Sequence, residues 1–367
     1  MRTSILGIIA GKEFRDHIRS RRVHIILAIF LIIAVVGLID GAVNYQEQID
    51  HYNENLAQTD DEMMHAIFWW KPSILSAFNR MSDLIATVGI VLGCAMGFDL
   101  ISREKESKSL KMLLSHPVYR DEVINGKALG GTAAIAAAMG IVLVVSFAIL
   151  LIFGVVPNFD ESVRILIFGV ISFLLIFSYF AIALFMSTVA ESSSNALIYT
   201  LIIFIVLSTL IPAVATNQTV QKVVIGEAPE PPDPPETVGG PTGSFNVMVK
   251  PMPIEISGEV EEAWREYEEE SRAYWEKRRA FIDTVNLLSP SKNYQEMTMA
   301  VTEPGYAASM LSDDPYSFDR PKDLPQSGLE ILAAIIGELA HYIIALIVMP
   351  AVFFGLAWVK FAREDIR

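Results

Sequence analysis

The sequence predicts an all-α polytopic membrane protein with six transmembrane helices, an N-terminal amphipathic elbow helix and a large extracytoplasmic insertion between helices 5 and 6. Three observations predict this fold. Of the 367 residues, 52% are hydrophobic and only 19% are charged, whereas soluble domains have about one quarter charged residues. The apolar residues form long stretches, and the charged residues gather between them.

Six apolar stretches are each long enough for a helix to cross about 30 Å of hydrocarbon. They are residues 23–43, 82–101, 129–153, 163–189, 196–214 and 339–359. The polar residues 191–195 separate the fourth stretch from the fifth, as a short turn would. No small-residue cleavage site follows the first stretch, so we interpret it as a retained anchor.

Basic residues flank the ends of these stretches unequally. They precede the first stretch, lie between the second and third, and follow the sixth: Arg2, Lys12, Arg15, Arg19, Arg21, Arg22, Arg103, Lys105, Lys108, Lys111, Arg120, Lys127, Lys360, Arg363 and Arg367. Because cytoplasmic loops are enriched in Lys and Arg, we expect both termini in the cytoplasm of a multi-pass plasma-membrane protein.

The same topology places residues 216–328 outside the cell. Residues 226–243 are rich in proline, which favours an extended linker, and residues 259–288 predict a helix with Ser257 as a possible N-cap. Apolar residues at spacings of three, four or seven form a stripe on one face of that helix: Trp264, Tyr267, Tyr274, Phe281, Val285 and Leu288. We expect this stripe to pack against its own ectodomain, a dimer mate or the membrane interface, or else to contact substrate. The expected domains are therefore 1–22, 23–215, 216–328 and 329–367.

Composition also bounds the chemistry. A net charge of -14 argues against nucleic-acid binding, and the single cysteine, Cys94, excludes an intrachain disulfide. Glu62 and His65, like Glu338 and His341, have the Glu-x-x-His spacing of di-iron bundles. Such a centre needs further carboxylates on facing helices. Glu62 falls in a predicted outer loop and Glu338 near the outer end of the sixth stretch, so we expect no metal.

The loop between the second and third stretches is the most informative segment. Its charged residues lead to a short amphipathic helix with Leu110, Leu113 and Leu114, which ends near Pro117. Such a helix at a membrane surface is a docking element, although the charges alone also fit a solvated connecting loop. Within the second stretch, Asp99 needs a partner because a carboxylate near hydrocarbon is costly, and we expect Arg103 to supply it.

The order of residues in this loop resembles the pattern of ABC-2 type permeases. In that family an Asp ends the second span and is followed by a Glu-rich segment, a Leu-Leu-Ser-x-Pro-Val-x-Arg element and a Gly-Lys pair. The matching residues are Asp99, Glu104, Glu106, Leu113, Leu114, Ser115, Pro117, Val118, Arg120, Gly126 and Lys127. The chain departs from the pattern at residues 107–110, where family members commonly have Gly-Thr-Leu. We interpret this departure as a change from Gly to Ser107.

Two flanking segments are similar to the same family. Residues 9–22, with Lys12, Glu13, Arg15 and Asp16, look like its elbow helix, and residues 361–366 look like its usual ending. The resemblance covers residues 9–214 and 339–367. It implies a dimer of six-span subunits in the bilayer, bound to cytoplasmic ABC ATPases that carry ATP and Mg, with the loop from Asp99 to Lys127 as the coupling element.

The residues themselves argue against an ATPase within this chain. A P-loop requires G-x-x-x-x-G-K-[ST], and the segments at Gly11–Lys12 and Gly126–Lys127 lack either the spacing or the hydroxyl. We therefore predict a non-enzymatic transport subunit with no bound cofactor.

Gly89, Gly93 and Gly97 lie four residues apart on one face of the second predicted helix. Small residues at this spacing allow close helix packing, either inside one subunit or at a permease dimer interface.

The predicted function is the permease of an ATP-driven transporter, with export as the expected direction. A second interpretation is mechanical work on an outer partner through the insertion. A third is an ion-coupled carrier, which usually has charged relay residues in mid-membrane. This sequence has few of them.

Overall fold

The computed structural model describes residues 2–58, 73–109, 119–232, 258–303, 306–307, 310 and 327–364, and these ranges contain helices but no strand. The chain divides into two compact units. One contains residues 1–209 and 287–367, and the other contains residues 210–286. Each unit is described on its own.

Six helical segments of the described chain are long and apolar enough to cross a membrane, which confirms the six predicted spans. They are Arg21–Glu54, Ile74–Glu106, Arg120–Ile152, Phe159–Val189, Ser193–Thr216 and Ile336–Arg363. The helix of the first span, α2 (Arg21–Gln58), is 38 residues long and continues well past the predicted end at residue 43. It is preceded by α1 (Arg2–Arg19), so the predicted elbow segment is helical and separated from α2 at Ser20.

The second span is a composite of several helical pieces. It comprises η1 (Ile74–Ser76), α4 (Ala77–Leu84), the π-helical segment η2 (Ile85–Gly89), α5 (Ile90–Gly97) and, after a turn, α6 (Ser102–Glu106). The fifth span likewise contains α10 (Ser193–Ile205), the π-helical segment η3 (Val206–Leu210) and α11 (Ile211–Thr216). The remaining spans are α8 (Arg120–Ile152), α9 (Phe159–Val189) and α17 (Ile336–Arg363).

Helix α9 forms the centre of the bundle. It begins at Asn158, whose side chain accepts a hydrogen bond from the Glu161 amide in a capping box. It packs against α5, α8, α10 and α17 and is the most buried of the six spans. Most of its buried residues are apolar, and their packing stabilises the bundle core.

The glycine face of the second span meets α9 inside this chain. A Cβ atom at Gly93 would lie 2.4 Å from the Ile176 carbonyl oxygen, and one at Gly97 would lie 2.6 Å from the Phe180 carbonyl oxygen. Only glycine allows these backbones to approach so closely. The face is therefore occupied by a contact within the subunit.

A helix from the predicted insertion belongs to the bundle. Helix α14 (Pro290–Thr302) packs against α4, α9 and α17, and its Thr298 hydroxyl lies 2.9 Å from that of Ser82. Helix α16 (Gly328–Ala334) also contacts α9. Residues 287–328 of the insertion predicted over residues 216–328 therefore share a compact unit with most of the membrane helices, whereas residues 216–286 belong to the other unit.

The other unit contains α11, α12 (Gln218–Val224) and α13 (Gly258–Asn286). Helix α13 confirms the helix predicted over residues 259–288, except for its last two positions; Ser257 lies outside the described residues. Trp264 and Tyr267 on the predicted stripe are half-buried and pack edge to face at 5.9 Å. Arg278 Nε donates to Gln221 Oε1 at 2.9 Å, which joins α13 to α12.

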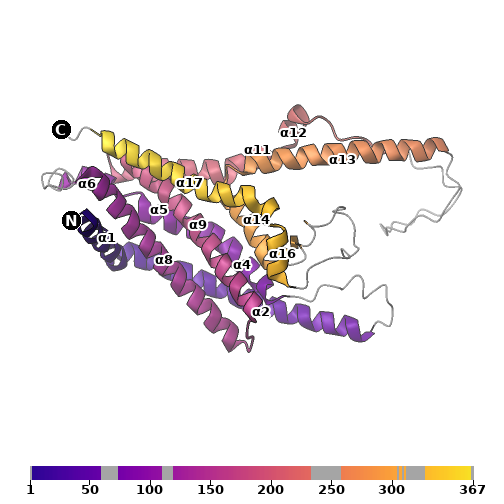
Figure 1. Ribbon diagram of the computed structural model, residues 1–367, viewed down its shortest axis with the longest axis horizontal. Helices are drawn as coiled ribbons and strands as arrows, with labels where there is room; N and C mark the ends of the chain where they lie inside the picture. Colours follow the sequence, from indigo (N-terminus) through magenta and orange to yellow (C-terminus); the bar gives the residue numbers. More distant parts are fainter. Residues whose placement is uncertain are drawn as a thin grey trace. The chain divides into compact units, whose positions relative to one another are not determined.

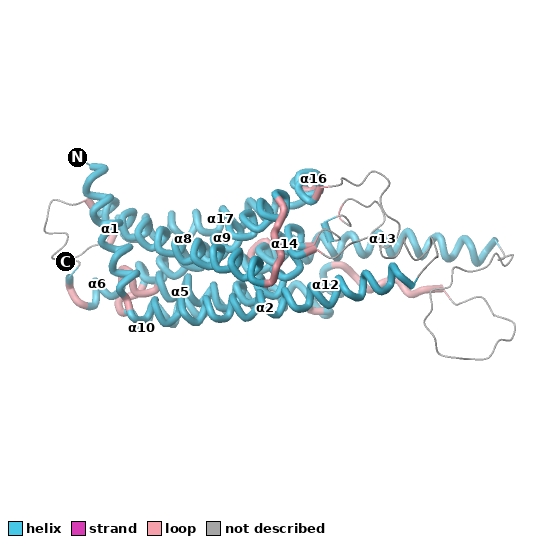
Figure 2. Tube along the Cα trace, turned by 90° about the horizontal axis from the view of Figure 1, so that it is seen from below, coloured by secondary structure: helices cyan, strands magenta, loops and turns pink. Residues whose placement is uncertain are grey.

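Helices α1 and α6 and both described ends of the chain lie at the same end of the bundle, as Figures 1 and 2 show. We call this the α6 end. The start of α8 lies there too, because Lys127 of α8 contacts Glu104 of α6. The described segments that the sequence assigned to one side of the membrane therefore share one end.

Candidate coupling site at the α6 end

Helix α6 has only five residues, and its start is held by α9. The backbone amides of Ile101 and Ser102 both donate to Ser187 Oγ at 2.9 Å. These amides would otherwise be unsatisfied at the start of a helix. Because Ser187 and Ser102 are both fully buried, α6 is attached to the end of α9 without solvent between them.

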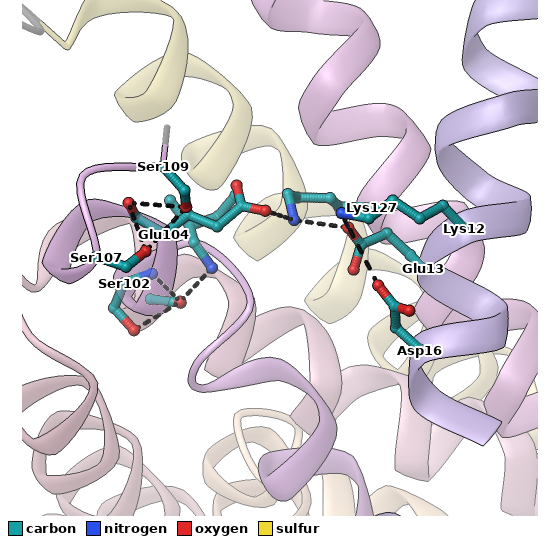
Figure 3. A network of polar contacts seen from close by, with 10 residues as sticks. Lys12, Glu13, Asp16, Ser102, Glu104, Ser107, Ser109 and Lys127 are labelled. Carbon is teal, nitrogen blue, oxygen red and sulfur yellow. Dashed lines mark hydrogen bonds and ion pairs between the residues drawn. The ribbon is translucent and has the colours of Figure 1, made fainter. Parts of the chain in front are cut away.

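Lys127 joins three helices at this end. Its Nζ lies 2.7 Å from Glu104 Oε1 on α6 and 2.8 Å from Glu13 Oε1 on α1, as Figure 3 shows. The Lys127 side chain is only 3% exposed, and a buried ammonium requires such charge partners. Lys127 therefore ties α1 and α6 to the start of α8.

The electrostatics of Glu13 agree with this geometry. Burial by itself raises the pKa of Glu13, but the adjacent Lys127 ammonium outweighs it, and the net pKa is lowered below the ordinary value. Glu13 is therefore charged at neutral pH and serves as a true ion-pair partner.

Two further side chains of α6 reach other spans. Lys105 Nζ lies 2.7 Å from Glu364 Oε1 after α17 and donates to the Thr188 carbonyl of α9 at 2.5 Å. Glu106 Oε2 accepts from the Ser193 amide at the start of α10 at 3.1 Å. We call Glu104, Lys105, Glu106 and their partners the α6 network, and it reaches α1, α8, α9, α10 and the end of α17.

The far end of the same loop is fastened to α17 as well. Arg120, the first residue of α8, donates from Nη1 to the carbonyl oxygens of Glu364 and, at 3.4 Å, of Ala362. A cation at a helix C-terminus interacts favourably with the unpaired carbonyls there. Both ends of the loop therefore contact the end of α17.

Asp99 has a different partner from the one predicted. Its Oδ2 lies 3.1 Å from Nη1 of Arg22, at the start of α2. The predicted partner, Arg103, contributes only its backbone amide, which donates to the Asp99 carbonyl at 3.2 Å. The expectation of an Asp99–Arg103 pair is therefore wrong. Arg22 is 77 residues away from Asp99 in the sequence. The i,i+4 spacing within one helix therefore could not predict this pair.

The turn after α6 shows where the chain departs from the permease pattern. Lys108 has φ 57°, in the left-handed region that favours glycine, whereas Ser107 has φ -80°. The glycine-like position is Lys108 and not Ser107, which corrects the interpretation of that departure. The hydroxyls of Ser107 and Ser109, 2.9 Å apart, both approach the Glu104 carbonyl and satisfy the end of α6 (Figure 3).

The predicted elbow segment packs on α8 through small residues. A Cβ atom at Gly130 would lie 2.7 Å from the Ala10 carbonyl oxygen, and one at Gly126 would lie 2.6 Å from Ile9 Cγ2. Lys12 pairs weakly with Asp16 at 3.8 Å, and Arg15 is exposed. Of the four elbow residues singled out in the sequence, only Glu13 enters the α6 network.

A cleft of about 770 Å³ opens between α1, the start of α2 and the end of the second span. Its lining is strongly polar: Lys12, Glu13, Asp16, His17, Arg19, Ser20, Arg21, Arg22, Val23, Ala95, Asp99, Leu100, Arg103, Glu104, Ser107, Ser109 and Lys127. Burial lowers the pKa of His17, although the charges of Glu13 and Asp99 oppose this effect. Its imidazole is therefore neutral at neutral pH.

Several predicted residues do not enter this description. Leu110, Leu113, Leu114 and Pro117 of the docking helix, and the Glu62–His65 pair, lie outside the described residues. Glu338 and His341 are exposed. No group of three metal-ligating side chains is found in the described part of the chain.

Four contributors to the site were missed by sequence reasoning. Three of them contribute a hydroxyl or a backbone group: Ser187, Thr188 and Ser193. Such contacts have no recognisable sequence pattern. Glu364 gave a signal, since residues 361–366 resemble the family's ending, but nothing in sequence connects it to Lys105.

Six long apolar helices are typical of a multi-pass membrane protein. The chain belongs to the ABC-2 family of transporter proteins, whose sequence pattern matches residues 8–366. This confirms the resemblance, and the match also includes residues 215–338, which the resemblance did not cover. Permeases of this family associate with an ABC ATPase subunit. Comparison with curated proteins gives no significant match.

Proposed function

We propose that this chain is the permease subunit of an ABC exporter and that a separate cytoplasmic ATPase drives it through the loop between α6 and α8. The observation that carries this proposal is the α6 network. A helix of five residues contacts α8, α9, α10 and the end of α17 through side chains or capped amides, and Lys127 of α8 connects it to Glu13 of α1. A passive connecting loop has no need for so many attachments.

The network offers a mechanical route for ATP-driven motion. A displacement of the loop moves α6, and α6 is tied to α8 through Lys127 and to α17 through Lys105 and Glu364. Because packed helices shift as rigid elements, a small movement at the loop is passed on to several spans together. This proposal requires the α6 end to face the cytoplasm, in agreement with the basic residues flanking the spans there.

A dimer of permeases with two ATPases completes the proposed transporter. The outer faces of α10 and α17 remain largely exposed in the single chain, which leaves apolar surface for lipid and for a second copy. The ATP and Mg reside on the ATPase.

The test of this function is recovery of the ATPase. The tagged permease is expressed together with a candidate ABC ATPase and purified in mild detergent, and we expect the two to co-purify. Leu113→Asp with Leu114→Asp is expected to release the ATPase, whereas Leu113→Met with Leu114→Met keeps it. Retention of the ATPase by the double Asp variant would show that this loop is not its docking site.

The separate unit of residues 210–286 supports a second candidate, mechanical action on an outer partner. Helix α13 is 29 residues long and carries a half-buried aromatic stripe. Deletion of residues 226–283 distinguishes the two functions. Loss of the phenotype with intact ATPase assembly favours the mechanical role, and an unchanged phenotype rejects it.

A further inference from the structure

We propose that the cleft between α1 and the end of the second span binds the phosphate of an anionic phospholipid headgroup from the adjacent leaflet. The proposal rests on the proposed function only for the orientation, which puts this cleft at the cytoplasmic leaflet. The ligand is identified by its chemistry: an anionic phosphate attached to an apolar anchor.

The cleft has basic side chains that the described chain does not neutralise. Each acid of its lining pairs with a base of the same lining: Glu13 and Glu104 with Lys127, Asp99 with Arg22, and Asp16 with Lys12. In contrast, Arg19, Arg21 and Arg103 form no ion pair with any described residue.

Guanidinium groups bind phosphate oxygens through paired charge-assisted hydrogen bonds. The cleft therefore has a surplus of the donors that a phosphate requires.

A second observation points to a missing ligand in the same cleft. His17 lines it and is 9% exposed, yet His17 Nε2 is buried without a hydrogen-bond partner among the described atoms. Buried polar atoms in folded proteins are nearly always hydrogen-bonded. A phosphate oxygen accepting from a neutral imidazole would satisfy this atom without the cost of burying another charge.

The position of the cleft matches that of a lipid headgroup. Arg22 directly precedes the apolar stretch of the first span, and Asp99 lies at the end of that of the second, so their ion pair marks the edge of the hydrocarbon. On α1, Ile8 and Ile18 are exposed, as expected of a helix whose apolar side chains enter the membrane interface. Basic pockets at this depth bind anionic headgroups.

A lipid bound here would act on the coupling machinery. The cleft lies beside Lys127 and is lined by both α1 and α6. A phosphate held by Arg19 of α1 and Arg103 of α6 would therefore link the same two helices that Lys127 links through its ion pairs. Anionic lipid would then reinforce the α6 network, and the coupling of ATP hydrolysis would depend on lipid charge.

The experiment measures lipid retention by the full-length permease without its ATPase. The protein is reconstituted in nanodiscs of phosphatidylcholine mixed with phosphatidylglycerol and then extracted. Native mass spectrometry identifies and quantifies the lipids that remain bound to it. The test variant is Arg19→Gln with Arg103→Gln. The control is Arg15→Gln, which changes an exposed arginine of α1 outside the cleft.

We expect the wild type and Arg15→Gln to retain phosphatidylglycerol in preference to phosphatidylcholine. Loss of two arginines is expected to weaken that retention about 30-fold. Equal unfolding temperatures in phosphatidylcholine alone show that the variant is folded. Unchanged retention by the double variant would overturn the proposal.

Two other outcomes would also overturn it. Full displacement of the lipid by inorganic phosphate assigns the cleft to a free anion. If the double variant keeps the lipid and loses the ATPase, the cleft is a protein interface. Because lipid retention is measured without the ATPase, failure of the proposed function leaves this result interpretable.

Discussion

Lys127 Nζ on α8 lies 2.7 Å from Glu104 Oε1 on α6 and is almost fully buried. This pair joins the end of the second span to the start of the third, across a loop whose sequence resembles that of permease coupling segments. Removing one partner of a buried pair leaves an uncompensated charge, which costs far more than the net worth of the pair.

The first prediction concerns the unequal cost of removing Lys127 and of neutralising Glu104. Lys127→Met leaves Glu13 and Glu104 without their cation and is expected to destabilise the bundle by about 3–5 kcal/mol. Glu104→Gln keeps an acceptor for Lys127 and is expected to cost about 1–2 kcal/mol. Denaturant unfolding in detergent measures both. Equal effects of the two variants would show that Lys127 is solvated in solution.

The second prediction locates the glycine-like position. Lys108→Gly removes a side chain from a left-handed residue and should stabilise the turn by about 1 kcal/mol. Ser107→Gly is the matched control because Ser107 has an ordinary φ of -80°, and it should be neutral or destabilising. Unfolding midpoints distinguish the two, and a gain from Ser107→Gly alone would contradict the structure of the turn.

The third prediction follows from the lowered pKa of Glu13. A carboxyl whose folded-state pKa is depressed stabilises the fold above its unfolded pKa, about 4.3, and this contribution is lost as the pH falls through the lowered folded value. Glu13→Gln should therefore be less stable than wild type at neutral pH, with the difference shrinking below about pH 4. Parallel stability curves for the two proteins would refute this.

Glu303 gives the fourth prediction, with the opposite sign. Burial raises the pKa of Glu303, against the effects of its Asn79 hydrogen bond and the Arg164 charge. A raised carboxyl pKa favours folding at low pH, and that contribution is lost as the pH rises through the folded pKa.

Glu303→Gln, which imitates the protonated acid, should therefore be more stable than wild type at neutral pH and equal to it in acid. The exposed Glu338→Gln is the control and should show no such gain. The measurement is thermal unfolding at several pH values.

The fifth prediction tests the glycine face. Gly93→Ala places a methyl group 2.4 Å from the Ile176 carbonyl oxygen of α9, so the helices must separate, at an expected cost of about 1–3 kcal/mol. Gly140→Ala in α8 meets nothing within 4 Å and should be neutral or slightly stabilising. A tolerated Gly93→Ala would contradict the packing of α5 on α9.

The sequence predicted the spans because length and apolar composition determine which segments can cross a bilayer. It also selected Lys127, Glu104 and Glu13, since their order resembles a known family. It did not show that these three meet, because Glu13 and Lys127 are 114 residues apart and their contact depends on how α1 packs on α8.

The failures have similar physical causes. Asp99 was paired with the nearest cation along its own helix, whereas Arg22 reaches it from a neighbouring span. Helix α14 was assigned to the insertion because it is too polar to predict a span. Its hydroxyls, such as those of Tyr294 and Thr298, are instead satisfied inside the bundle by Ser172 and Ser82.

The most direct test of the α6 network compares ATP-dependent hydrogen exchange in the permease–ATPase complex. Lys105→Met with Arg120→Gln removes both side-chain links from the loop to the end of α17. Lys360→Met with Arg363→Gln alters exposed cations of the same helix and is the control.

In the wild type and the control, ATP is expected to change the hydrogen exchange of backbone amides of α8 and α17 at the α6 end. In the Lys105→Met, Arg120→Gln variant the change is expected to persist in α8 and to disappear from α17. An undiminished response of α17 would contradict transmission through these contacts.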